Sequence, residues 1–190
     1  MELTEQEANQ FNYHYEVATK KMEGIVILEN YRPKKIGFFE KMRAKKSLQH
    51  FENALAIFPH HFPSLFFIGK IYQRFAEYEK ALSYFEKALE IEKENYNLPQ
   101  EASLVAMDLN LIDKAIEYSN EALQRSPDNF ALMGNHAMNL LIAGKDESAK
   151  EIIDKAIKLE PNDRINKNIQ NKINAVILKE IKRPTFKDSI

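Results

Sequence analysis

Apolar residues recur at helical spacing along most of the chain, and the pattern comes in pairs of segments. In Glu79-Lys-Ala-Leu-Ser-Tyr-Phe-Glu-Lys-Ala-Leu-Glu-Ile, the apolar side chains share one helical face and polar side chains fill the other. This spacing predicts an amphipathic helix with one face turned to a core. The stretch before it, Ser64-Leu-Phe-Phe-Ile-Gly-Lys-Ile-Tyr, has a similar stripe and predicts a second helix. The two segments therefore predict a helix pair joined by a short turn.

The helix pair recurs with a period of 34 residues. A fixed period of this length indicates that one supersecondary unit is stacked in copies. Small residues at this interval are expected where two helix backbones approach, because a larger side chain would overpack the contact by about 1–3 kcal/mol. Prolines at the same interval end the second helix, since proline lacks the backbone donor. The residues that keep the register are Ala54, Ala88, Ala122 and Ala156; Ser47, Ala81, Ala115 and Ala149; Gly69, Ser103 and Ala137; and Pro59, Pro127 and Pro161.

This layout resembles the tetratricopeptide repeat, a helix–turn–helix unit of 34 residues. The copies lie at 62–95, 96–129 and 130–163, with a degenerate copy at 31–61 that matches only in its second half. The resemblance implies an all-α fold, a right-handed α-solenoid of antiparallel helix pairs that runs as one unit through residues 1–190. Tight turns inside the pairs are expected at Asn110 and Gly144, where a left-handed residue is often needed.

Residues 4–30 are expected to form one long N-terminal helix. Thr4 and Glu7 match a capping box, and one face is apolar from Phe11 to Leu28. This helix can replace the missing first helix of the degenerate copy, or it can lie in the groove of the superhelix as a built-in ligand. We favour packing in the copy, because the helix expected at 37–58 has an apolar face and no other neighbour.

Isoleucine recurs every fourth residue from Ile165 to Ile181, with polar residues between. Residues 164–182 therefore predict a helix with one apolar stripe, which suits a cap over the last copy. The alternative is a helix that binds a partner. Residues 183–190 are expected to form a flexible tail.

Composition narrows the functional classes. The net charge is −1, so no overall field favours nucleic acid or an acidic membrane surface. The chain has no cysteine, which excludes disulfides and thiol catalysis. No apolar run approaches the roughly 20 residues that span a bilayer, and the first residues lack the pattern of a signal peptide. We expect a cytoplasmic protein with no membrane partner.

Catalytic and metal-binding motifs are hard to find in the sequence. His60 and His61 adjoin in a turn and His50 lies upstream, but a metal site needs three or four converging ligands. His136 replaces an aliphatic residue and is expected to be partly buried and hydrogen-bonded. The five glycines form no phosphate-binding loop. We therefore expect no enzyme, no metal and no cofactor.

The segment 32–46 carries an excess of basic side chains. Such a patch attracts phosphate groups or an acidic protein surface. Phe38 and Phe39 lie beside it, but we expect them to pack the helix rather than to stack on bases. With a neutral overall charge, nucleic acid is the less favoured partner. The cations, opposed by Glu40, are Arg32, Lys34, Lys35, Lys41, Arg43, Lys45 and Lys46.

The first helix of each pair is expected to line a concave face of the solenoid. Side chains that the pairs do not need are available there to a partner, and methionines adapt to varied ligands. The expected groove is basic and aromatic at its first wall and aliphatic beyond it. Its residues are Phe66, Lys70, Gln73, Arg74, Gln100, Leu104, Met107, Asp108, Gly134, Met138 and Leu141.

We interpret the chain as a non-catalytic scaffold or adaptor that binds a peptide or helix of a partner protein in this groove. Some tetratricopeptide modules hold the C-terminal carboxylate of a chaperone through Lys, Arg and Asn from three first helices. In this chain Lys70 and Arg74 alone match, and Glu101 stands in the path, so that mode is disfavoured. The alternatives are self-association and a secretion-type chaperone, which has a similar plan of three repeats between flanking helices.

Overall fold

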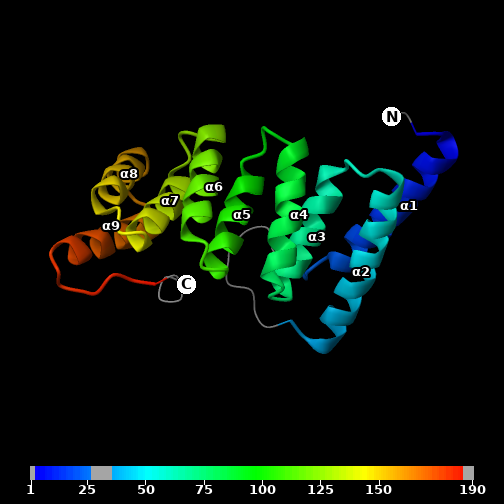
Figure 1. Ribbon diagram of the computed structural model, residues 1–190, viewed down its shortest axis with the longest axis horizontal. Coiled ribbons are helices and arrows are strands. Elements are labelled where there is room, and N and C mark those ends of the chain that lie inside the picture. The colour runs from blue at the N-terminus through cyan, green and yellow to red at the C-terminus, as the bar shows by residue number, and fades with distance from the viewer. Residues whose placement is uncertain (1–2, 27–35, 186–190) are drawn as a thin grey trace. The chain divides into compact units, whose positions relative to one another are not determined.

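The computed structural model describes residues 3–26 and 36–185. Within these residues the chain forms nine α-helices and no strand, which confirms the predicted all-α class (Figure 1). The helices fall into two compact units, Met1–Lys93 and Glu94–Ile190. That residues 1–190 form one continuous solenoid remains a prediction.

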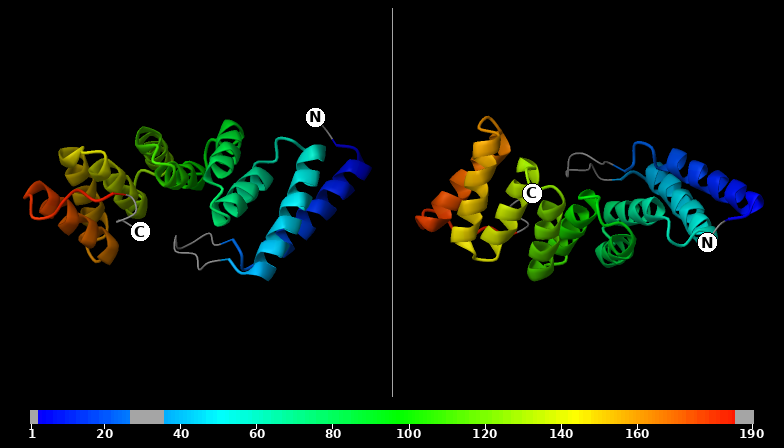
Figure 2. Two further views of the ribbon diagram at one scale, coloured as in Figure 1. Left: turned by 60° about the horizontal axis from the view of Figure 1, so that its bottom comes forward. Right: turned by 90° about the horizontal axis from the view of Figure 1, so that it is seen from above.

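The first unit consists of two helix pairs. The first pair packs α1 against α2 and the second packs α3 against α4, while α2 also contacts α3. In each pair the two helices run antiparallel (Figures 1 and 2). Phe51, Ile68 and Ile71 are buried in the core that these helices share. The helices are α1 (Glu5–Met22), α2 (Phe38–Ile57), α3 (Phe62–Arg74) and α4 (Tyr78–Ile91).

The N-terminal helix is shorter than the predicted span of 4–30. It begins with the expected capping box of Thr4 and Glu7 and ends at Met22, two residues before Gly24 turns the chain with a φ of 72°. The turn brings Ile25 into the same core as Ile68 and Ile71, although Ile25 is no longer helical. The helix α1 packs along α2, as the first helix of a pair does. This agrees with the favoured prediction that it replaces the first helix of the degenerate copy rather than lying in the groove. Residues 27–30 lie outside the described residues.

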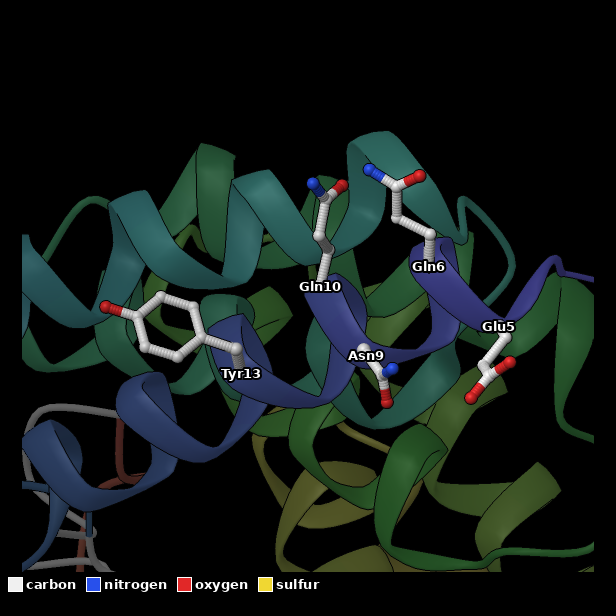
Figure 3. A pocket seen from close by; sticks show the side chains of 5 residues that line it. All are labelled: Glu5, Gln6, Asn9, Gln10 and Tyr13. Atoms are coloured by element: carbon white, nitrogen blue, oxygen red, sulfur yellow. The ribbon is translucent and has the colours of Figure 1, made fainter.

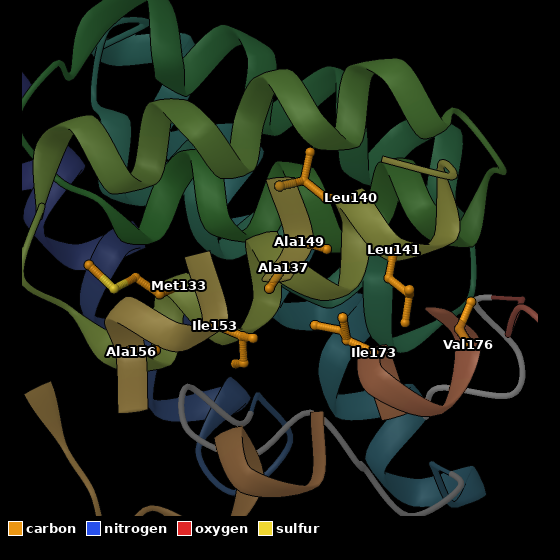
Figure 4. Close-up of a cluster of buried hydrophobic side chains, with 9 residues drawn as sticks. All are labelled: Met133, Ala137, Leu140, Leu141, Ala149, Ile153, Ala156, Ile173 and Val176. Atoms are coloured by element: carbon orange, nitrogen blue, oxygen red, sulfur yellow. The ribbon is translucent and has the colours of Figure 1, made fainter. Parts of the chain in front are cut away.

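The second unit contains two further pairs and a final helix. The pairs are α5 with α6 and α7 with α8, and α9 contacts both α7 and α8. Ile153, Ile173 and Val176 from α8 and α9 share a buried cluster with residues of α7 (Figure 4). The helices are α5 (Asn97–Asp108), α6 (Ile112–Arg125), α7 (Phe130–Ile142), α8 (Asp146–Leu159) and α9 (Arg164–Ile177).

Small residues occupy the tightest contacts between helices, as the periodic pattern predicts. Gly69, Ser103 and Ala137 are all buried. A Cβ added at Gly69 would lie 2.6 Å from the ring of Phe85, which is itself fully buried in α4. The ring has no room to withdraw, so the absence of a side chain at Gly69 allows α3 and α4 to pack this closely.

The turns inside the last three pairs share one backbone conformation. Asn110 and Gly144 have the expected positive φ values of 58° and 81°. Ala76, at the same repeat position, also has a positive φ, 56°, which the sequence pattern did not indicate. An alanine Cβ is crowded in this conformation, whereas glycine adopts it freely.

The C-terminal segment differs from the predicted helix 164–182 and flexible tail 183–190. The helix α9 ends at Ile177, and Lys179 follows with a φ of 59°, so Ile181 lies outside the helix and is exposed. Arg183 is not loose: its Nη2 donates to Oδ2 of Asp146 at 2.9 Å, and Pro184 is buried. Residues 186–190 lie outside the described residues.

A buried polar contact joins α6 to α7. Oγ of Ser119 and Nδ1 of His136 are 2.7 Å apart, and both residues are buried as expected for His136. Burial lowers the pKa of His136, and the nearby charge of Lys145 lowers it further. Burial also lowers the pKa of His61 in the first unit. Protonation of either imidazole therefore opposes folding.

We predict that Ala76→Gly stabilises the protein. Glycine removes the Cβ crowding at a φ of 56°, and Ala76 is exposed, so no packing is lost. The expected gain is about 1 kcal/mol in the free energy of unfolding, or about 2–4 °C in Tm. Thermal denaturation followed by circular dichroism measures it. Gly144→Ala makes the reverse change at the equivalent position and should lower the Tm by a similar amount. An unchanged Tm in both variants would show that an alanine is not strained at this turn position.

We also predict that stability falls as the pH drops below about 6.5, the ordinary histidine value. The folded-state pKa of His136 and His61 is lowered, so the unfolded chain binds more protons below that pH and is favoured. Tm measured between about pH 7.5 and pH 5 should decrease, and the decrease should be smaller in His136→Gln. His60→Gln, which changes an exposed imidazole, is the control. An equal pH dependence in all three proteins would rule out His136 as a contributor.

Candidate functional site

The predicted first wall of the groove, on α3, is largely occupied by the chain itself. Lys70 is only 4% exposed. Nε of Arg74 donates to the backbone oxygen of Ile25 at 2.9 Å, so the turn after α1 lies against α3. Phe66 is half-buried, with its ring centroid 5.8 Å from that of Phe85, and Gln73 is half-buried as well. The sequence pattern missed this cover because it treated residues 4–30 as one straight helix.

Two residues predicted to be exposed in the groove belong to the core. Met107 is 2% exposed and packs with Ala106 and Ala115. Leu141 is 0% exposed and lies in the cluster that includes Ile173 of α9 (Figure 4). The prediction of exposure was wrong for both, because the repeat pattern alone does not show how far the following helices cover α5 and α7.

Gly134 is also not a groove residue. A Cβ added there would lie 2.1 Å from Oδ1 of Asn166, which is buried at the start of α9. Nδ2 of Asn166 in turn donates to the backbone oxygen of Phe130 at 3.0 Å. Gly134 therefore serves the close approach of α7 and α9 rather than contact with a partner.

The remaining predicted residues of the second unit keep part of their surface accessible. Gln100, Leu104 and Asp108 follow one another at helical spacing on α5, and Met138 lies on α7; all four are half-buried. Ala131 and Asn135 share the stripe of Met138 and are exposed; Asn135 was not among the predicted groove residues. We call this set the α5–α7 face; its residues are Gln100, Leu104, Asp108, Ala131, Asn135 and Met138.

A buried polar link holds the two helices of this face together. Nδ2 of Asn139 on α7 donates to Oγ of Ser103 on α5 at 2.9 Å, and Oγ of Ser103 donates to the backbone oxygen of Ala115 at 2.8 Å. All three residues are buried. Because a buried hydrogen bond between side chains tolerates little sliding, the link sets the register of α5 against α7.

The α5–α7 face contains one unusual polar atom. Oε1 of Gln100 is buried, and no hydrogen-bond partner for it is present among the described residues. Buried oxygen atoms of this kind are nearly always paired, because leaving one unpaired costs about 1–3 kcal/mol. The unpaired oxygen of Gln100 therefore costs the fold stability in this arrangement.

Other contacts between potentially reactive groups are structural. Ser119 and His136 resemble a nucleophile and a base, but both residues are buried between α6 and α7. His14 on α1 and His50 on α2 have Nδ1 atoms 3.0 Å apart and link the two helices. In the described part of the chain, no three histidine or acidic side chains form a group that would bind a metal ion.

A hollow on the surface of α1 is lined by side chains of that helix (Figure 3). All five come from α1, so they do not converge on a ligand from two elements. The lining is polar apart from the ring of Tyr13. Its residues are Glu5, Gln6, Asn9, Gln10 and Tyr13.

The basic segment 32–46 is only partly described, since Arg32, Lys34 and Lys35 lie outside the described residues. The prediction that Phe38 and Phe39 pack the helix was wrong: their side chains are 73% and 80% exposed. None of the helices in the described residues combines the length and apolar character required to cross a bilayer.

Comparison with known proteins agrees with the repeat pattern. The family model of the tetratricopeptide repeat matches residues 62–95, 100–129 and 131–163, just over half of the chain. No curated protein shows significant similarity to the sequence.

Several solved structures share the fold at low identity. The MamA RS-1 ArsTM double mutant is 10% identical over 95% of this chain and 90% of that chain, with a TM-score of 0.73. YrrB, described as a protein with an unusual peptide-binding site, is 15% identical over 87% of this chain and 86% of its own, with a TM-score of 0.61. The first tetratricopeptide repeat domain of Spaghetti (RPAP3), bound to the HSP90 peptide SRMEEVD, is 20% identical over 62% of this chain and 93% of its own, with a TM-score of 0.58.

At these identities the likeness shows the fold alone. It confirms the predicted class, an all-α solenoid built from helix pairs. Together with the three matched repeats, it establishes that the chain belongs to the tetratricopeptide repeat family.

Proposed function

We propose that the protein is a non-catalytic interaction scaffold that binds a peptide or short helix of a partner protein on the α5–α7 face. The observation that carries the proposal is the pair Leu104 and Met138, two large apolar side chains that stay half-buried on neighbouring first helices. Extended peptides and short helices bind other proteins through apolar anchors of this kind. The predicted cytoplasmic location stays a prediction.

The chemistry of the face suits a partner with apolar anchors and free backbone amides. Leu104 and Met138 offer apolar contact, and the flexible Met138 side chain adapts to different shapes. The exposed amide of Asn135 both donates and accepts. The buried link between Asn139 and Ser103 supports recognition, because it holds the two helices in place before a partner arrives.

Relatives with the same fold support peptide binding in general, but the partner of this chain differs from theirs in chemistry. The Spaghetti domain is bound to SRMEEVD, which is rich in carboxylates. Here Lys70 is buried and Arg74 already donates to Ile25. The α5–α7 face carries Asp108 and has no cation of its own. An acidic peptide would meet repulsion rather than a clamp.

We predict that Leu104→Glu abolishes partner capture without unfolding the protein. A carboxylate on the α5–α7 face cannot be desolvated under an apolar anchor, so affinity should fall at least about tenfold. The experiment uses the purified full chain as bait in native cell extract and compares the captured proteins by quantitative mass spectrometry. Leu159→Glu, which makes the same change at an exposed position at the end of α8, is the matched control.

Circular dichroism of Leu104→Glu, Met138→Glu and Leu159→Glu should show the helical content of the parent. Proteins lost with Leu104→Glu and Met138→Glu but retained with Leu159→Glu are the partners that use the face. Equal capture by all variants would show that partners bind elsewhere and would refute the assignment.

We also predict that the chain does not bind the peptide SRMEEVD. Of the two cations predicted for the groove, Lys70 is buried and Arg74 donates to the chain's own backbone. Fluorescence anisotropy with a labelled peptide should show no saturation up to about 1 mM protein, which corresponds to less than about 4 kcal/mol of binding free energy. Saturable binding in the micromolar range would show that the chain does present cations that hold the carboxylates of this peptide.

A further inference from the structure

The start of α2 carries an exposed apolar patch. Phe38 and Phe39 are 73% and 80% exposed, more than any other large apolar side chain in the described residues, and Met42 follows one turn later at 46%. The two rings touch each other edge to face, with centroids 5.6 Å apart and planes at 78°. Contiguous apolar surface of this kind is rare on a protein that has no use for it.

The patch lies on the side of α2 that faces away from the core. Ala44, Leu48 and Phe51 are buried against the rest of the first unit. At 100° per residue, Met42 and Lys46 lie on the other side of the helix, near the two phenylalanines. Lys45 lies at the border of this side and is exposed, as is Lys46. We call Phe38, Phe39, Met42, Lys45 and Lys46 the α2 tip.

The charge at the α2 tip is positive. The one acidic residue in 36–46, Glu40, accepts a hydrogen bond from the backbone N–H of Gly37 at 2.7 Å and so caps the helix. Nζ of Lys41 lies over the ring of Phe75, and Nη2 of Arg43 donates to the backbone oxygen of Glu23. Lys45 and Lys46 are exposed and have long, flexible stems, so their charges can stay in water beside the apolar side chains.

We propose that the α2 tip binds the surface of an anionic lipid bilayer. The phenylalanine and methionine side chains carry no hydrogen-bonding group and enter the boundary between headgroups and acyl chains, while the lysines meet anionic headgroups. In this arrangement the apolar side chains contact acyl chains, and the lysine ammonium groups lie against anionic headgroups. It departs from the sequence-based expectation of no membrane partner, which relied on the neutral overall charge and on the absence of an apolar run long enough to span a bilayer.

A nucleic acid fits the α2 tip less well than a bilayer. Bases of a single strand stack on ring faces in succession. The planes of Phe38 and Phe39 differ by 78°, so two neighbouring bases cannot stack on both rings in one direction. Met42 adds apolar surface that provides neither an aromatic ring for stacking nor a strong hydrogen-bonding group for a base. The α2 tip is also separate from the α5–α7 face, so its test does not depend on partner capture.

The chain contains no tryptophan, which permits a direct test. Phe39→Trp places a single indole at the α2 tip of the full chain. Its emission should shift to shorter wavelength on vesicles of phosphatidylcholine with about 30% phosphatidylserine, and the shift should weaken with salt. Leu178→Trp, at an exposed apolar position after α9, is the control and should show no shift.

Vesicle sedimentation then measures the contribution of each part. In the parent chain, Phe38→Ser with Phe39→Ser should lower the partition coefficient at least about tenfold. Lys45→Gln with Lys46→Gln should remove most of the preference for anionic over pure phosphatidylcholine vesicles. Circular dichroism checks that these surface changes leave the helices intact.

Three results would overturn the proposal. The first is no binding of the intact chain to anionic vesicles. The second is binding that the phenylalanine pair does not affect. The third is that the intact chain binds labelled oligothymidine, or dimerises in light scattering, instead of binding vesicles. Loss of that binding or dimer in the phenylalanine variant would assign the α2 tip to the other occupant.

Discussion

Close approach between helix backbones governs how this chain folds, because it decides which faces of two helices meet. At Gly69 and Gly134 there is no space for even a methyl group, since the ring of Phe85 and the amide of Asn166 fill it. Buried alanines such as Ala81 and Ala149 allow a similar approach from the second helices. Once these contacts are made, each apolar stripe is directed into a shared core and the polar stripes face solvent.

Buried polar groups add register to this packing. Oγ of Ser47 donates to the backbone oxygen of Ala18 at 2.8 Å and joins α2 to α1. Ser103 and Asn139 join three helices of the second unit in the same way. An apolar contact tolerates a small slide along a helix, whereas a buried hydrogen bond does not, because its unpaired partners would lose their solvation without compensation. These links therefore fix the positions of the helices that carry the proposed α5–α7 face.

The two proposed surfaces show how one repeat architecture offers different chemistry on different helices. The α5–α7 face combines half-buried apolar side chains with amides and Asp108, on helices that are held together by Asn139. The α2 tip presents two largely exposed phenylalanines beside lysines near a helix start. The first suits a partner that supplies its own backbone donors, and the second suits a surface that offers apolar chains below anionic groups. Both are placed on helices rather than loops, so little ordering is needed on binding.

The repeat could be predicted from the sequence alone. The period of 34 residues located α3 to α8, the prolines that end α2, α6 and α8, and the left-handed turns at Asn110 and Gly144, because all of these depend on backbone geometry within one helix pair. Which residues remain accessible depends instead on how the helices pack. Met107 and Leu141 are buried by later helices, Ile25 covers α3 through a turn at Gly24, and Phe38 and Phe39 remain largely exposed. Exposure depends on what lies across from a side chain, and helical periodicity carries no information about distant partners.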